Sequence, residues 1–142
     1  MESKCPLLSI CIPTYNRSYI LKYVLEKYVS DSEFDDDIEI VISDNTSTDD
    51  TEQICMFYVE KYTNIRYYRN KENVRDANFL MVLDYAHGEY LKLLNDWSFI
   101  IGDSLRFVKE KLRENQKSRF PIFLPIIIFI QKRKLKLLNV TI

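Results

Sequence analysis

Two β-branched apolar runs, each ending abruptly in polar residues, constrain the fold of this chain more than any other feature. The first run, Leu8–Ile12, leads into the polar segment Pro13–Arg17, and the second, Ile40–Ile42, leads into Ser43–Asn45. A helical pattern follows each polar segment. Short apolar strands that alternate with helices are typical of a parallel α/β sheet, in which ligands bind beyond the carboxyl ends of the strands.

The same alternation continues along the chain and predicts one domain over residues 1–142. We expect a doubly wound, mostly parallel sheet with helices on both of its faces. The predicted strands are Leu7–Pro13, Ile38–Ser43, Ile65–Arg69 and Tyr90–Leu94. The predicted helices are Tyr19–Val29, about Asp49–Tyr62 with a capping box of Ser47 and Asp50, a helix carrying Phe79 and Ala86 that ends at His87, and about Asp103–Gln116.

Composition excludes several classes of protein. The net charge of −1 supplies no basic face, so we expect no nucleic-acid partner. The only two glycines, Gly88 and Gly102, are too few for a dinucleotide GxGxxG turn or a phosphate-binding P-loop. Three cysteines without metal-ligand spacing indicate reduced thiols, with Cys11 and Cys55 in core positions. The first predicted strand follows the N-terminus almost directly, with no secretory signal before it, which favours a cytoplasmic protein.

The C-terminal segment, residues 120–142, is apolar and then basic. Phe120–Ile130 is almost wholly apolar but too short to span a bilayer, which takes about twenty residues. We interpret this apolar run first as a fifth strand of the sheet. The alternative is a contact with a membrane surface, in which the apolar run acts together with the basic cluster Lys132–Lys134.

Polar residues follow each predicted strand and should meet at one edge of the sheet. They lie in Pro13–Arg17, in Asp44–Asn45, in the Asn73–Asn78 loop and in Asn95–Asp96. Each cluster alone is compatible with turn or capping chemistry, and Asn16 is a candidate helix cap. Together they offer an aromatic ring for a base, amides and hydroxyls for hydrogen bonds, and a guanidinium for phosphate, which predicts a nucleotide site.

These motifs, in this order, resemble the family 2 glycosyltransferases of the GT-A fold. The resemblance covers roughly residues 7–112 and is nearest to bacterial enzymes that build capsule, lipopolysaccharide O-antigen or related surface glycans. It rests on the strand with Pro-Thr-Tyr-Asn-Arg, the strand with Ser-Asp-Asn-Thr-Ser-Thr-Asp-Asp-Thr, Arg69–Asn73, and Ala86–Tyr90 running into Leu94-Asn95-Asp96.

The resemblance implies transfer of a sugar from a nucleotide-diphosphate sugar, expected to be a UDP-sugar, to a saccharide or lipid-linked acceptor with inversion. It implies a place of action in the cytoplasm or at the inner face of the membrane. It also implies that Tyr15 lies against base or ribose, Arg17 near the phosphates, Asp44 on the base, and Asp96 on ribose and a divalent Mg²⁺ or Mn²⁺ ion. The implied donor-binding residues are Pro13, Thr14, Tyr15, Arg17, Asp44, Asn45, Asn73, Asn78, Asn95 and Asp96.

The sequence departs from the family pattern at two points. The acidic metal site usually has two or three carboxylates, whereas Asn95-Asp96-Trp97 keeps one, so a metal-poor or metal-independent site is an alternative. No residue has the motif of the general base that activates the acceptor hydroxyl in inverting members, and the nearest candidates are Asp103 and Glu110.

The sequence leaves two alternatives to a complete transferase. One is a nucleotide-sugar-binding fragment without catalysis, since the acceptor half and base are not recognisable and the chain reads as truncated. Its exposed sheet edges would then favour self-association. The other is a receiver-like signalling domain, which needs an acidic cluster after the first strand, where Pro13-Thr14-Tyr15 stands instead.

Overall fold

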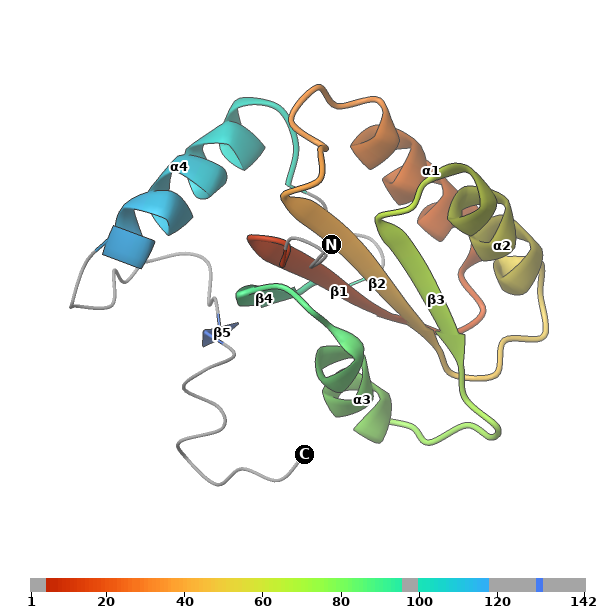
Figure 1. Cartoon of the computed structure of the whole chain (residues 1–142). Coiled ribbons are helices and arrows are strands. Elements are labelled where there is room, and N and C mark those ends of the chain that lie inside the picture. Colours follow the sequence, from red (N-terminus) through yellow and green to blue (C-terminus); the bar gives the residue numbers. More distant parts are fainter. Residues whose placement is uncertain (1–4, 96–99, 118–129, 132–142) are drawn as a thin grey trace.

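The computed structural model describes residues 5–95, 100–117 and 130–131, which alternate between strands and helices along the chain (Figure 1). One sheet runs through the middle of the fold, with helices packed on both sides. The elements are β1 (Leu8–Thr14), α1 (Ser18–Val29), β2 (Ile38–Asp44), α2 (Thr51–Lys61), β3 (Ile65–Arg69), α3 (Ala77–Tyr85), β4 (Tyr90–Leu93), α4 (Asp103–Lys117) and β5 (Ile130–Gln131).

The sheet has the strand order β3-β2-β1-β4-β5. The first four strands are parallel, and the two-residue β5 pairs antiparallel with β4. The predicted doubly wound, mostly parallel sheet is therefore confirmed. β1 and β2 run in register as far as the pair Thr14 and Asp44, one residue beyond the predicted end of each strand. The polar residues after these two strands consequently start at the same level of the sheet.

Alternation of side chains along the strands separates two cores. Ile10 and Ile12 of β1 face a large cluster that includes Leu25 of α1, Tyr58 of α2 and Leu105 of α4. Cys11 of β1 and Val41 of β2 face a smaller cluster with Val82 and Leu83 of α3. Three helices thus cover one face, and α3 covers the other, as Figure 1 shows.

Burial agrees with the sequence at the two cysteines that were predicted to lie in the core. Cys11 and Cys55 are buried free thiols, as expected, and Cys5 is exposed. Of the predicted strand Phe120–Ile130, only Ile130 lies within the described residues, where it begins β5. No helix in the described part of the chain is long and apolar enough to cross a membrane.

Candidate functional site

The polar residues that follow the central strands line one cleft of about 310 Å³ at the carboxyl edge of the sheet. The strand order reverses here, because β2 and β3 lie on one side of β1 and β4 lies on the other. Connections that leave toward opposite faces at such a switch point open a crevice between them. The lining residues are Pro13, Thr14, Tyr15, Arg17, Asn45, Arg75, Asn78, Phe79 and Asn95.

Most residues predicted for the site meet in this cleft. Pro13, Thr14, Tyr15, Arg17, Asn45, Asn78 and Asn95 all contribute to its lining. Three predicted residues do not line it in the described structure. Asp44 is buried beside the cleft, Asn73 lies in the neighbouring loop, and Asp96 falls in the undescribed residues 96–99.

Two lining residues were not predicted from the sequence. Arg75 ends the polar loop before α3, and Phe79 is 39% exposed although it belongs to the apolar pattern of that helix. Their signal in the sequence is a basic and an aromatic residue four positions apart, in the same segment as Asn73 and Asn78.

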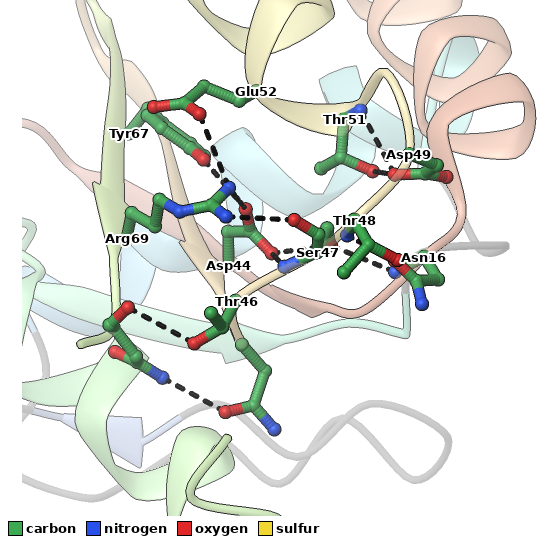
Figure 2. A network of polar contacts seen from close by, with 12 residues as sticks. Asn16, Asp44, Thr46, Ser47, Thr48, Asp49, Thr51, Glu52, Tyr67 and Arg69 are labelled. Carbon is green, nitrogen blue, oxygen red and sulfur yellow. Dashed lines mark hydrogen bonds and ion pairs between the residues drawn. The ribbon is translucent and has the colours of Figure 1, made fainter. Parts of the chain in front are cut away.

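Asp44 is completely buried and accepts hydrogen bonds from four groups (Figure 2). Its Oδ1 accepts from the backbone N–H (2.9 Å) and the hydroxyl (2.5 Å) of Ser47. Its Oδ2 accepts from the Tyr67 hydroxyl (2.7 Å) and from Arg69 Nη1 (3.1 Å). A carboxylate offers about four acceptor positions, so the protein itself occupies all of them. Asp44 therefore ties β2 and β3 to the loop that follows β2.

The two side chains that donate to Asp44 Oδ2, Tyr67 and Arg69, are held in their protonated, hydrogen-bond-donating forms. Arg69 also contacts Glu52 at 3.3 Å and donates to the Ser47 carbonyl at 2.8 Å. Burial raises the pKa of the Tyr67 hydroxyl, and its hydrogen bond to Asp44 raises that pKa further. The phenol consequently stays protonated and donates to the carboxylate. We call this network closed, because protein donors occupy every acceptor position of the Asp44 carboxylate.

Asn45 lines the cleft, but its amide is engaged in shaping the next loop. Its Oδ1 accepts from the Val74 N–H at 2.8 Å and from Asn70 Nδ2 at 3.2 Å. Its Nδ2 donates to Asn73 Oδ1 at 2.8 Å, and Asn73 Oδ1 also accepts from the Arg75 N–H at 2.9 Å. Asn45 and Asn73 therefore fix the loop before α3 against the end of β2.

Asn78 anchors the start of α3 to the same strand. It is 3% exposed, and its Oδ1 accepts from the Ser43 hydroxyl at 2.6 Å while its Nδ2 donates to the Ser43 carbonyl at 2.9 Å. Hydrogen bonds between Asn78 and Ser43 thus position the second wall of the cleft, together with the apolar contacts of α3.

The loops after β1 and β2 are tied directly to each other, as Figure 2 shows. Asn16 has a positive φ of 50° and donates its N–H to the Ser47 hydroxyl at 2.8 Å. Its Oδ1 accepts from the Thr48 N–H at 2.7 Å. Asn16 is therefore a cross-loop clamp, and the candidate role as a cap of α1 is wrong.

The cap of α1 comes instead from Asp49, on the loop after β2. Asp49 Oδ2 accepts from the Ser18 N–H at 3.0 Å, and its Oδ1 accepts from the Thr51 hydroxyl at 2.5 Å. Burial alone would raise the pKa of Asp49, but the hydrogen bonds from Thr51 and Ser18 lower it to about 2. The predicted capping box of Ser47 and Asp50 is wrong, because Asp50 makes no side-chain cap and Ser47 bonds Asp44.

The described residues do not by themselves form a metal site. No group of three or more His, Cys, Asp or Glu side chains within the described ranges could hold a metal ion. Asp96 and Trp97 lie outside those ranges. The two candidate bases, Asp103 and Glu110, are on α4 and do not line the cleft, and Asp103 contacts Arg106 at 3.2 Å.

A second cavity of about 660 Å³ lies at the opposite, amino edge of the sheet. Glu39 in its wall is 4% exposed and accepts from Ser9 Oγ (2.5 Å), the His87 N–H (2.5 Å) and Arg66 Nη2 (2.7 Å). Burial alone would raise the pKa of Glu39, but these hydrogen bonds lower it. Gly88 is required here because a Cβ would lie 2.4 Å from Ser9 Oγ. This cavity is larger than the cleft, yet its carboxylate is already satisfied.

Comparison with known proteins agrees with this architecture and assigns it to a family. The chain belongs to glycosyl transferase family 2, whose family model matches residues 9–124. The abequosyltransferase RfbV of Salmonella typhimurium is 39% identical over 108 residues, which are 75% of this chain and 32% of that protein. A Campylobacter jejuni relative, GalNAc(5)-diNAcBac-PP-undecaprenol β-1,3-glucosyltransferase, is 30% identical over 111 residues, 77% of this chain and 35% of its own length.

Solved structures share the fold. TarS 1-349 of S. aureus, in complex with UDP, has a TM-score of 0.68 and 23% identity, over 77% of this chain and 32% of that TarS 1-349 chain. A mannosyltransferase from Pyrobaculum calidifontis, in complex with GDP-Man and Mn²⁺, has a TM-score of 0.70 and 16% identity, over 96% of this chain and 47% of that enzyme. The chain spans about a third of the length of the two curated relatives it matches here.

Proposed function

We propose that this chain binds a nucleoside-diphosphate sugar, expected to be a UDP-sugar, at the carboxyl edge of its sheet. In this role it is the donor-binding half of a glycosyltransferase that acts on a saccharide or lipid-linked acceptor in surface-polysaccharide synthesis. We place the reaction in the cytoplasm, at the inner face of the membrane where the acceptor is lipid-linked. The cleft at the switch point, lined by seven of the residues expected for the donor, is the observation that carries the proposal.

The chemistry of the lining suits a nucleotide. Tyr15 and Phe79 are 45% and 39% exposed, and they offer aromatic surface to a base. Thr14 and Asn95 add a hydroxyl and an amide for the base and ribose, and Arg17 adds positive charge for phosphate. In this proposal Asp44 supports the site through Ser47 and Arg69, because its own oxygens are occupied.

The proposal includes a divalent ion, for which Asp96 is the one protein ligand expected. Mg²⁺ sites commonly use one or two carboxylates together with substrate phosphates, so a single carboxylate fits that pattern. When bound, such an ion neutralises charge that develops on the leaving diphosphate. Mn²⁺ is therefore expected to tighten binding of UDP, and Asp96→Asn is expected to remove that enhancement. Equal affinity with Mn²⁺ and with a chelator would instead support a metal-independent site.

A second candidate function is nucleotide-sugar binding without transfer. The observation in its favour is that no carboxylate lines the cleft in the described residues, and an inverting transferase needs a base within hydrogen-bond reach of the acceptor hydroxyl. The two functions share the donor site, so a binding experiment tests both, and a transfer assay separates them.

Nuclear magnetic resonance of the isotope-labelled chain tests the binding site directly. Addition of UDP is expected to shift the amide signals of the cleft residues Tyr15, Asn45 and Arg75. The amides of His87 and Asn64, at the amino-edge cavity, are the internal control and should not move. Shifts confined to the amino edge, or no shift with UDP, CDP or GDP, would contradict the proposal. Transfer to a saccharide acceptor by the same sample would then exclude the binding-only alternative.

A further inference from the structure

We propose that Arg75 binds the diphosphate of the donor, acting with Arg17 so that one guanidinium approaches the phosphates from each face of the sheet. This inference rests on the proposed function and adds to it a residue that determines selectivity for the diphosphate over the nucleoside. Three features of the described structure carry it: the position of Arg75, its backbone conformation and its lack of a carboxylate partner.

The two arginines enter the cleft from opposite sides. Arg17 lies at the start of α1, which packs in the larger core cluster on one face of the sheet. Arg75 comes shortly before α3, which packs in the smaller cluster on the other face. Both line the cleft, and none of its described lining residues is a carboxylate. The described lining therefore has a formal charge of two positive units and suits an anion that lies across the strand ends.

The backbone at Arg75 indicates that the side chain matters. Arg75 has a positive φ of 52°, in the left-handed region, where a non-glycine residue is strained and glycine is not. The conformation is held by the Asn73 side chain, which accepts from the Arg75 N–H at 2.9 Å, and by a longer contact of 3.5 Å from Asn45 Nδ2 to the Arg75 carbonyl. Strained backbone held in this way is typical of ligand-binding loops.

Four other arginines of the described chain contact carboxylates within 4.0 Å. They are Arg66 with Glu39, Arg69 with Asp44, Arg106 with Glu33, and Arg113 with Asp37. The Arg75 guanidinium contacts no carboxylate within the described ranges, and it lines the cleft instead. A guanidinium fork that contacts no carboxylate of the described chain matches the geometry of phosphate oxygens.

Binding of UDP and of uridine by the whole chain separates a phosphate contact from a base contact. Arg75→Gln removes the charge and keeps a shorter polar side chain, and Arg75→Lys keeps the charge without the fork. Lys71→Gln is the matched control, because Lys71 is an exposed cation of the same loop that does not line the cleft. Each protein is titrated with both ligands, once with Mn²⁺ and once with a chelator, and its thermal unfolding midpoint is recorded.

We expect Arg75→Gln to weaken UDP binding by about tenfold or more in both conditions, as for the loss of a hydrogen bond to a charged group. Uridine affinity should stay unchanged, Arg75→Lys should lose less than Arg75→Gln, and Lys71→Gln should match the wild type. Independently of any variant, raising the salt concentration should weaken UDP binding by the wild-type chain more than uridine binding. This salt comparison keeps the inference testable if a variant does not fold.

Three results would overturn the inference. Equal losses for UDP and uridine would place Arg75 on the base, and unchanged UDP affinity would remove it from the site while leaving the proposed function intact. The third is a wild-type UDP affinity that does not change with salt. Failure of the wild-type chain to bind any nucleotide is a different outcome, which removes the proposed function and this inference with it.

Discussion

The loop after β2 and the walls of the cleft are both rich in polar side chains, but they use those side chains differently. Around Asp44, each carboxylate oxygen has two donors, and the partners come from the same loop and from β3 (Figure 2). In the cleft, Tyr15 and Arg75 stay exposed, and the Arg75 guanidinium contacts no carboxylate in the described chain. Similar composition therefore serves two purposes, and burial together with the number of partners distinguishes the scaffold from the ligand surface.

The largest expected effect on folding stability comes from substituting Asp44, at the centre of its closed hydrogen-bond network. Asp44→Asn removes the charge that faces Arg69 and replaces one acceptor with a donor, while the site stays buried. Removing one partner of a buried pair costs about 3–5 kcal/mol, and the partial exposure of Arg69 places the expected loss of folding stability at the lower end of that range. Chemical denaturation measures it.

Asp50→Asn is the control for that variant, because Asp50 is exposed on the same loop and should change stability by less than about 0.5 kcal/mol. An Asp44→Asn protein that kept its stability but lost UDP binding would move Asp44 from the scaffold to the ligand surface. That outcome would erase the distinction between the two regions.

A second hydrogen-bond network, around Glu39 at the amino edge, should also contribute to folding stability, and its contribution should depend on pH. The pKa of Glu39 is lowered in the folded chain from its ordinary value of 4.5, so the unfolded chain binds more protons in acid. Its contribution to stability is present above about pH 4.5 and is lost as the pH falls through the lower, folded pKa. Glu39→Gln should cost about 2–3 kcal/mol at pH 7 and flatten the acid limb of the stability curve.

Stability curves of wild type and variant from about pH 7 to pH 3 measure this difference. Asp36→Asn, an exposed carboxylate that also borders the amino-edge cavity, serves as the control and should leave the curve unchanged. Parallel acid limbs for wild type and Glu39→Gln would show that Glu39 does not carry the effect.

In the cleft, the opposite pattern is expected: loss of binding with little loss of stability. Tyr15→Ala removes an exposed ring, and loss of base stacking costs about 1–3 kcal/mol, or roughly tenfold to a hundredfold in UDP affinity. Folding stability should change by less than about 0.5 kcal/mol. Calorimetric titration and thermal unfolding of the same samples measure both quantities.

Tyr19→Ala is the matched control, since Tyr19 is 84% exposed on α1 and does not line the cleft. Equal UDP affinities for the Tyr15 and Tyr19 variants would argue that the base does not lie against Tyr15. A large loss of stability on Tyr15→Ala would mean that the cleft, too, is part of the scaffold.

The smallest effect is expected at Thr46, where the two regions join. Thr46 is β-branched, yet it has a φ of 67°, and its hydroxyl donates to the Asn70 carbonyl at 3.1 Å. Thr46→Val keeps the strain and loses the hydrogen bond, whereas Thr46→Gly loses the bond and relieves the strain. The glycine variant should therefore be more stable than the valine variant by about 1 kcal/mol. The reverse order would show that the loop is not strained at this position.

The sequence by itself determined the sheet and the edge at which the cleft lies. Apolar β-branched runs such as Leu8–Ile12 specify buried strands locally, and successive strands that run parallel place their following residues at one edge. Seven of the ten candidate donor residues could be located from that rule. Whether each of them contacts a nucleotide stays a prediction.

Only the tertiary structure decided which polar residues turn inward. Asp44 and Asn45 are adjacent, yet Asp44 faces Tyr67 and Arg69, which lie more than twenty positions away, while Asn45 borders the cleft. Asp49 likewise caps a helix from another loop. Such partners are set by the packing of separate elements, because a hydrogen bond depends on distance and direction in space and not on spacing along the chain.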